Sequence, residues 1–146
     1  CEVCTLTEDE MELSYRHTVF SENKNLICIS ATFTLKEGKK DEIDAVMRDL
    51  MQRRISKQPL EYPSAGSVFK RPAPDLFVGK MIEDSGLKGY TIGGAQVSEK
   101  HAGFIINVGG ATAKDVLALV GHIQGVIRQN YGVEIECEIR RAGTGE

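Results

Sequence analysis

Residues 104–139 read FIINVGGATAKDVLALVGHIQGVIRQNYGVEIECEI and carry the clearest structural signals of the chain. Thr112 and Asp115 resemble a capping box, with aspartate in place of glutamate, and predict a helix that begins after Thr112. One apolar stripe follows at helical spacing, formed by Val116, Leu119, Val120, Ile123, Val126 and Ile127. Gly132 ends this helix. Short strands are expected before it, at residues 104–107, and after it, at residues 133–139, where apolar side chains alternate with glutamates.

The residues upstream of this stretch alternate between turns and short regular elements. Residues 89–97 indicate a glycine-broken strand region, and residues 76–85 a short helix that stops at Gly86. Residues 58–75 contain four prolines and predict a stiffened loop, because proline fixes φ and removes a backbone donor. Long loops in a compact domain are often functional.

The first 57 residues predict a β segment followed by a helix. Residues 25–35 alternate apolar and polar side chains with period two, as a half-buried strand does, and residues 1–35 as a whole read as β. From Lys40 the period becomes helical, so we expect an amphipathic helix from Asp41 to about Ile55. A boundary near Gly38 would divide the chain into a β segment, residues 1–38, and an α+β domain, residues 39–146.

The composition excludes some classes of protein. The 146 residues include 18 basic and 21 acidic side chains, a formal net charge of −3, whereas a general nucleic-acid-binding domain would be strongly basic. No apolar run approaches the roughly 20 residues of a membrane-spanning helix, and no leader is recognisable, so a soluble, cytoplasmic protein is expected. The four cysteines predict reduced thiols and no metal site, although Cys1-x-x-Cys4 resembles half a zinc knuckle.

The loop between Arg53 and Arg71 is the first candidate for a ligand site. It holds five basic residues against a single acidic one, Glu61, in a chain that is acidic overall. Arginine and lysine suit phosphate or carboxylate ligands, but a solvated basic surface would have the same composition. Within the loop, Gly66 precedes Ser67 and permits an unusual φ that would aim the hydroxyl at a ligand. Taken alone, Ser67 is better explained as a turn residue, and no Gly-x-Ser-x-Gly elbow is present.

Three glutamates, at positions 134, 136 and 138, form the second candidate site. Residues two apart on a strand share one face, and like charges raise a carboxyl pKa where that face is shielded from water. On an exposed face the same residues would only be the polar side of a strand. Tyr15-Arg16 and the isolated His101 are candidates with structural alternatives, and the glycines fit no nucleotide-binding fingerprint. The residues alone therefore indicate an anion-binding domain with a possible serine and glutamate site.

Five segments, taken in order, resemble the C-terminal part of the UDP-N-acetylenolpyruvoylglucosamine reductase (MurB) family. They are LSYRHTVF (13–20), QPLEYPSAGSVFKRP (58–72), LKGYTIGGAQVS (87–98), the strand at 102–107, and IECEIR (135–140). The resemblance implies an α+β substrate-binding domain at residues 39–146, preceded at residues 1–38 by the last β segment of an FAD-binding domain. It also implies a cytoplasmic oxidoreductase of peptidoglycan synthesis, and so of cell-wall biogenesis, cell shape and division.

This family reduces UDP-N-acetylglucosamine enolpyruvate to UDP-N-acetylmuramate with FAD and NADPH. By resemblance, Ser67 would protonate C2 of the enolpyruvyl group, and Arg16 and Glu138 would bracket the substrate carboxylate. A serine can act as an acid only when its position and charged surroundings assist it. Other family positions that contact substrate or line the site match Tyr15, Arg54, Lys57, Lys70, Arg71, Lys88 and His101.

The sequence departs from the family pattern at a few positions. Ser14 replaces a glycine, Cys137 replaces a proline, and Arg71 stands where some members have asparagine. The N-terminal part of the family, which holds most FAD contacts, is not in this chain, which starts without Met. We therefore expect a piece of a longer protein that alone binds FAD weakly or not at all and is inactive. The alternatives are a non-catalytic nucleotide-sugar-binding module and a structural domain without a ligand.

Overall fold

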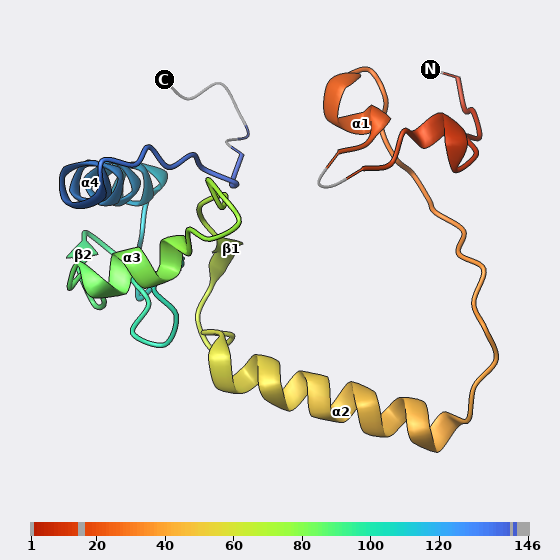
Figure 1. Cartoon of the computed structure of the whole chain (residues 1–146), viewed down its shortest axis with the longest axis horizontal. Coiled ribbons are helices and arrows are strands. Elements are labelled where there is room, and N and C mark those ends of the chain that lie inside the picture. Colours follow the sequence, from red (N-terminus) through yellow and green to blue (C-terminus); the bar gives the residue numbers. More distant parts are fainter. Residues whose placement is uncertain (1, 15–16, 141, 143–146) are drawn as a thin grey trace. The chain divides into compact units, whose positions relative to one another are not determined.

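The computed structural model describes residues 2–14, 17–140 and 142 of the chain, which divides into two units, Cys1–Lys39 and Lys40–Glu146 (Figure 1). The first unit contains a 3₁₀ turn, η1 (Asp9–Met11), and a short helix, α1 (Val19–Glu22). Thr18 caps α1 through a hydrogen bond that its side chain accepts from the amide of Phe20.

The strand expected at residues 25–35 does not form. Residues 23–39 contain neither helix nor strand, and the apolar side chains of the alternating pattern, Ile27, Ile29, Phe33 and Leu35, are 77–85 % exposed. The alternation identifies which face would be buried, but a strand also requires a neighbouring strand to accept its backbone hydrogen bonds. No described residue of this unit supplies a strand of that kind.

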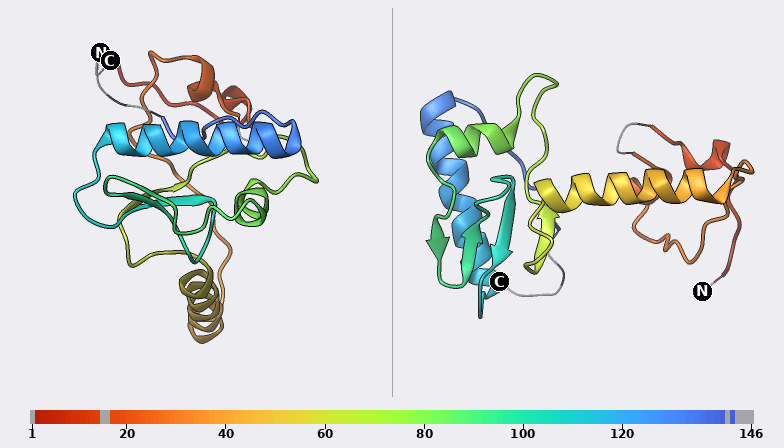
Figure 2. Two further views of the ribbon diagram at one scale, coloured as in Figure 1. Left: turned by 90° about the vertical axis from the view of Figure 1, so that its left-hand side faces the viewer. Right: turned by 90° about the horizontal axis from the view of Figure 1, so that it is seen from below.

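The second unit is built on an antiparallel sheet with strand order β1-β4-β3-β2. The strands are β1 (Ser64–Ser67), β2 (Thr91–Ile92), β3 (Ala95–Val97) and β4 (Phe104–Asn107). Two helices, α3 (Val78–Asp84) and α4 (Ala113–Tyr131), accompany the sheet, and α4 packs against β2 and β3 (Figure 2). Side chains of α3, α4, β2, β3 and β4 form one core together with Val68 and Phe69, which follow β1 directly. Its most deeply buried members include Val68, Ile82, Val97, Leu119, Ile123 and Ile127. The α+β class is confirmed.

Helix α4 begins and ends where the sequence predicts. The Thr112 hydroxyl accepts from the Asp115 amide, and the Asp115 carboxylate accepts from the Thr112 amide, which completes the capping box. Gly132 lies in the left-handed region, with φ 68°, and its amide donates to the carbonyl of Arg128. Both ends of the helix are thus fixed by local hydrogen bonds.

Two segments differ from their sequence-based expectation. β1 lies inside the proline-containing loop, because residues 64–67 pair with the edge of β4 despite the prolines around them. Residues 133–139 form no continuous strand. Their β pairing is limited to a bridge between Phe69 and Cys137, which is flanked by backbone hydrogen bonds from Lys70 to Glu136 and from Glu138 to Val68. Ile135 is buried in the core.

Helix α2 (Lys40–Lys57) carries three of the five basic residues of the candidate loop, Arg53, Arg54 and Lys57, at its C-terminal end. None of its side chains is buried, and its apolar residues are 44–63 % exposed. An apolar surface of this extent on one helix is unusual for a protein that works alone. Among the described residues, no helix is long and apolar enough to cross a membrane.

We predict that Gly94→Ala destabilises the second unit, because a Cβ there would overlap the carbonyl oxygen of Gly109 and the amide of Ala111. Backbone atoms cannot move aside cheaply, so the free energy of unfolding should fall by about 1–3 kcal/mol. Gly121→Ala is the control, since nothing lies within 4 Å of its added carbon. It should raise the free energy of unfolding by about 0.5–1 kcal/mol. Urea denaturation of both variants measures this, and equal values for the two would contradict the packing.

Candidate functional site

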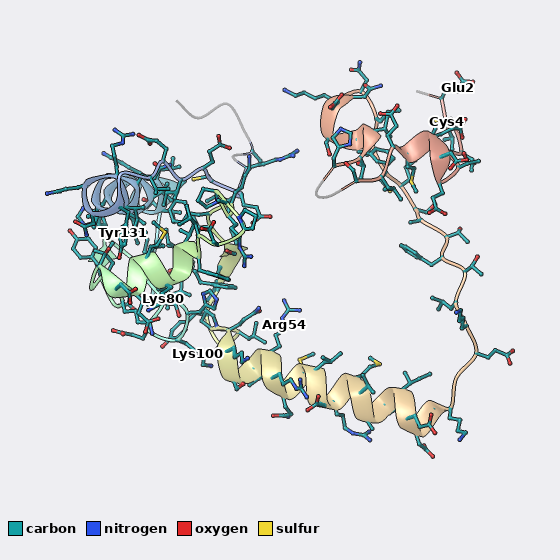
Figure 3. All side chains as sticks on the ribbon, in the orientation of Figure 1. Glu2, Cys4, Arg54, Lys80, Lys100 and Tyr131 are labelled. Atoms are coloured by element: carbon teal, nitrogen blue, oxygen red, sulfur yellow. The ribbon has the colours of Figure 1, made fainter. Side chains whose placement is uncertain are left out.

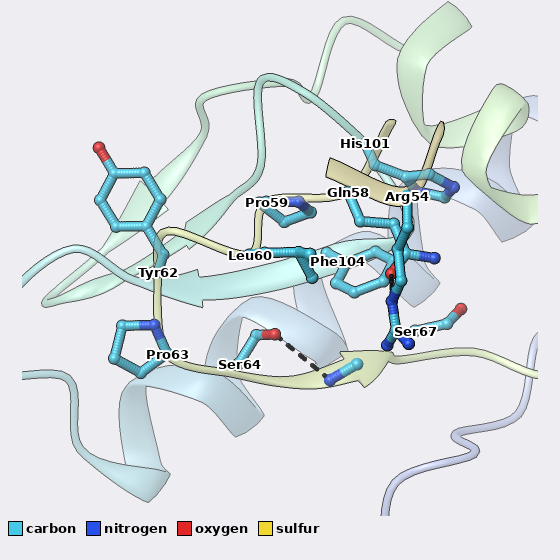
Figure 4. A pocket seen from close by; sticks show the side chains of 11 residues that line it. Arg54, Gln58, Pro59, Leu60, Tyr62, Pro63, Ser64, Ser67, His101 and Phe104 are labelled. Atoms are coloured by element: carbon cyan, nitrogen blue, oxygen red, sulfur yellow. Dashed lines mark hydrogen bonds between the residues drawn. The ribbon is translucent and has the colours of Figure 1, made fainter. Parts of the chain in front are cut away.

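A pocket of about 660 Å³ lies where the end of α2, the start of β1 and the loop before β4 meet (Figure 4). Eleven described residues line it: Arg54, Gln58, Pro59, Leu60, Tyr62, Pro63, Ser64, Gly66, Ser67, His101 and Phe104. No aspartate or glutamate occurs among these eleven. One guanidinium, hydroxyls and apolar rings therefore face the pocket together, a combination that suits an organic anion.

Arg54 comes from the last turn of α2 and extends toward the end of β1 that carries Ser67 (Figure 4). Its Nε donates a hydrogen bond to Oε1 of Gln58, at 3.0 Å. The amide of Gln58 in turn donates to the carbonyl of Arg54, at 2.9 Å, and closes the helix. Gln58 thus orients the guanidinium plane, whose fork of N–H groups matches the oxygens of a phosphate or carboxylate.

Ser67 is the last residue of β1 and is exposed to the pocket. Gly66, directly before it, has φ 84°, a left-handed conformation that a side chain would strain. The register between β1 and β4 shifts between Ser64 and Ser67, and the next residue, Val68, donates to the carbonyl of Gly103 at 2.9 Å. The unusual φ predicted for Gly66 is confirmed, and the irregular register directs the serine at the pocket.

His101 also lines the pocket, and its ring packs closely against Gly103. The amide of Gly103 donates to its Nδ1 at 3.1 Å, so the neutral ring carries its proton on Nε2. A Cβ at Gly103 would come within 3.1 Å of Nδ1, and Phe104 meets the ring edge-on at 5.0 Å. His101 is therefore held rigidly and lines the pocket, whereas the residues alone favoured a purely structural role.

The structure does not bring the other basic candidates among its described residues to the pocket lining. Lys70 pairs with Glu136 at 3.0 Å, and Lys88 pairs with Glu83 at 2.7 Å. The Arg71 guanidinium lies over the Phe77 ring, 4.3 Å from its centre. Lys57, on the last turn of α2, is exposed outside the lining set. Tyr15 and Arg16 lie outside the described residues. The binding roles of these six residues stay predictions.

Two of the three glutamates form the polar, solvent-facing side of their segment. Glu134 accepts from Arg128, and Glu136 accepts from Lys70, with both carboxylates exposed. Glu138 is also exposed, but its backbone amide donates to the carbonyl of Val68 at 2.7 Å. Glu138 thus lies beside the residue that follows Ser67, although the two are far apart in sequence. Its catalytic role stays a prediction.

Sequence reasoning singled out Arg54, Ser67 and His101 but missed other parts of this site. Gln58, Tyr62 and Phe104 line the pocket, and Lys100 donates hydrogen bonds to Ile55 and Glu61, which adjoin lining residues. The helical spacing of Arg54 and Gln58 could have indicated their pairing. The contacts of Lys100 cross 39 to 45 positions and leave no local signal. Among the described residues, no group of histidine, cysteine, aspartate or glutamate could hold a metal ion.

Residues 58–142, more than half of the chain, match the family model for the UDP-N-acetylenolpyruvoylglucosamine reductase C-terminal domain. A reductase of that name from Fervidobacterium nodosum is 55 % identical over 138 residues, which are 94 % of this chain and 45 % of the relative. One from Clostridium perfringens is 52 % identical over 143 residues, 98 % of this chain and 46 % of the relative. The chain thus spans less than half the length of these relatives.

A solved structure gives the same result. The crystal structure of the reductase (MurB) from Thermus caldophilus superimposes with a TM-score of 0.57 and 38 % identity, covering 72 % of this chain and 37 % of that one. The chain belongs to the family of UDP-N-acetylenolpyruvoylglucosamine reductase C-terminal domains.

Proposed function

We propose that this chain is the substrate-binding part of a cytoplasmic oxidoreductase that makes UDP-N-acetylmuramate from UDP-N-acetylglucosamine enolpyruvate for peptidoglycan synthesis. The observation that carries the proposal is the pocket: in a domain of this family, Arg54 and the Ser67 hydroxyl face a space with no acidic side chain in its lining. Arg54 binds an anionic part of the nucleotide sugar, and Tyr62, Leu60 and Phe104 provide apolar walls.

In this proposal the enolpyruvyl double bond is reduced by a hydride at C3, which bound FAD would supply, and Ser67 delivers a proton from Oγ to C2. A serine hydroxyl is a weak acid, and a guanidinium lining the same pocket supports the proton transfer by stabilising the negative charge that develops. The bracketing of the substrate carboxylate by Arg16 and Glu138 rests on the resemblance alone. The position of the Glu138 backbone beside Val68 is compatible with it.

FAD and NADPH supply the reducing equivalents in the proposed reaction, and we propose that residues 23–39 of this chain do not hold the flavin. Residues 23–39 have no regular structure and four apolar side chains that are 77–85 % exposed, so they enclose no slot for a ring system. We propose that the cofactors are held by the part of the relatives that this chain does not span. The exposed apolar residues of α2 are a surface against which that part would pack.

The test is a titration of the isotope-labelled chain with UDP-N-acetylglucosamine enolpyruvate, followed by amide NMR. We expect saturable shifts at Leu60, Ser67 and Gly103, because these amides lie on or beside the pocket wall. N-acetylglucosamine, which lacks the diphosphate, should produce much weaker shifts. Equal responses to both sugars, or none at the pocket, would exclude a nucleotide-sugar site. In a parallel addition of FAD, the flavin absorbance spectrum should stay that of free FAD. A stoichiometric complex of FAD with the chain would refute the cofactor proposal.

A further inference from the structure

Lys100, in the loop between β3 and β4, makes three hydrogen bonds to parts of the chain distant in sequence. Its Nζ donates to the carbonyl of Ile55 at 3.1 Å and to the two carboxylate oxygens of Glu61 at 3.1 and 3.2 Å. Figure 3 shows Lys100 at the C-terminal end of α2, near Arg54. One ammonium group therefore joins a helix end, the segment before β1 and the loop before β4.

Lys100 and its two partners each adjoin a pocket residue. Ile55 follows Arg54, Glu61 lies between Leu60 and Tyr62, and Lys100 itself precedes His101. The walls of the pocket thus meet at the ammonium of Lys100, although Lys100 is not among the residues that line the pocket.

Hydrogen bonds matter here because packing does little to hold α2. The helix has no buried side chain, so the direction of its last turn is not fixed by a core contact. The last carbonyls of a helix carry partial negative charge and lack partners within the helix, and a lysine ammonium satisfies both needs. The ammonium of Lys100 donates to the carbonyl of Ile55, and the Lys100 side chain is only 33 % exposed.

The charge of Glu61 supports the same contact. The pKa of Glu61 is lowered, first by a hydrogen bond from its own backbone amide and then by the hydrogen bond from Lys100. The carboxylate is therefore charged throughout the neutral range, and the ion pair with Lys100 persists there.

We propose that Lys100 is a positioning residue of the pocket: it holds the last turn of α2 and the segment around Glu61 against the His101 loop, so that Arg54 faces Ser67. This proposal rests on the proposed function in one respect, namely that Arg54 is the group that binds an anion. Lys100 acts through Arg54 and does not contact the ligand.

The first experiment uses the 146-residue chain without ligand and compares Lys100→Met with Lys80→Met. Lys80 is the matched control, because it pairs with Asp84 within α3 at 2.9 Å, away from the pocket. In Lys100→Met, hydrogen exchange of the Arg54 Nε–H and of the Leu60 and Tyr62 amides should accelerate about fivefold to tenfold. Core amides should keep their rates, and Lys100→Arg should restore the local protection. Unchanged local rates, or equal acceleration throughout the core, would overturn the proposal.

The second experiment measures binding of uridine diphosphate to the same variants by NMR titration. Lys100→Met should weaken binding about threefold to tenfold, and Glu61→Gln should weaken it less, because the hydrogen bond from Lys100 to the carbonyl of Ile55 remains. The double variant should be no weaker than Lys100→Met alone, because that substitution already removes the ion pair with Glu61. Weakened binding with an unaltered Arg54 Nε–H signal would mean that Lys100 contacts the ligand, which overturns the positioning role. If the unmodified chain binds no uridine diphosphate, the proposed function fails, and the exchange rates still decide the role of Lys100.

Discussion

Ser67→Ala lowers the rate of UDP-N-acetylmuramate formation by about 10²–10⁴-fold, the usual contribution of one general acid, if Ser67 is the proton donor. The substitution removes the hydroxyl and leaves β1, the left-handed Gly66 and the remaining pocket walls in place. Binding of the nucleotide sugar should therefore stay within about tenfold, or roughly 1.4 kcal/mol. The large loss would lie in turnover rather than in affinity.

The measurement requires a full-length reductase in which this chain replaces the matching 45 % of the Fervidobacterium nodosum relative. Ser56→Ala is the control, since that hydroxyl donates to the carbonyl of Arg53 within α2 and lies outside the pocket lining. Turnover by Ser67→Ala at the level of the Ser56→Ala control would show that the serine is only a turn residue. In that case the alternative of a non-catalytic nucleotide-sugar-binding module would be favoured.

The second large effect is expected for Arg54→Met, which should weaken binding of uridine diphosphate about tenfold to a hundredfold. This corresponds to roughly 1.4–2.8 kcal/mol, the range of a hydrogen bond to a charged group. Methionine keeps much of the unbranched stem of the side chain but removes the fork that Gln58 orients through Nε. The neighbouring Arg53 pairs with Asp49 at 2.8 Å and is outside the pocket lining, so Arg53→Met is a control of equal charge change.

Calorimetric titration of the chain at two salt concentrations separates the effects of Arg54 and Arg53. A general loss of positive charge would weaken binding similarly in both variants and would disappear at high salt. If Arg54 binds the anion, the affinity for uridine diphosphate should fall only in Arg54→Met. Most of the difference in affinity between the Arg54→Met and Arg53→Met variants should then remain when salt is raised. Equal affinities of the two variants would exclude Arg54 as the anion-binding group.

The parts of the fold that the sequence predicts well are those whose signals are local. The ends of α4 follow from Thr112, Asp115 and Gly132, each of which acts within four residues of itself. The short strand at residues 104–107 is found at the predicted bounds, and α3 begins two residues later than expected. Capping and turn chemistry involve neighbours in the chain, so they can be recognised without knowledge of the tertiary structure.

The segments that differ from expectation depend on distant partners. The alternation at residues 25–35 predicts a strand, yet a strand forms only beside another strand. β1 is not predicted from the sequence, because prolines surround it and its partner strand β4 lies about forty residues further along the chain. In the site, Ser67 and Arg54 could be selected from residue type and spacing. The bracing of α2 by Lys100 could not, because it depends on how two loops meet in space.

The exposed apolar side chains of α2 connect the pocket to any partner that binds this helix. An 18-residue helix is about 27 Å long, so it is a stiff lever with Arg54 and Gln58 at one end. A partner that binds the apolar side chains of α2 near Lys40 sets the tilt of the helix. A tilt of a few degrees displaces the opposite end, which carries Arg54, by about 2 Å. Docking of that partner would thereby tune the aim of the guanidinium from a distance.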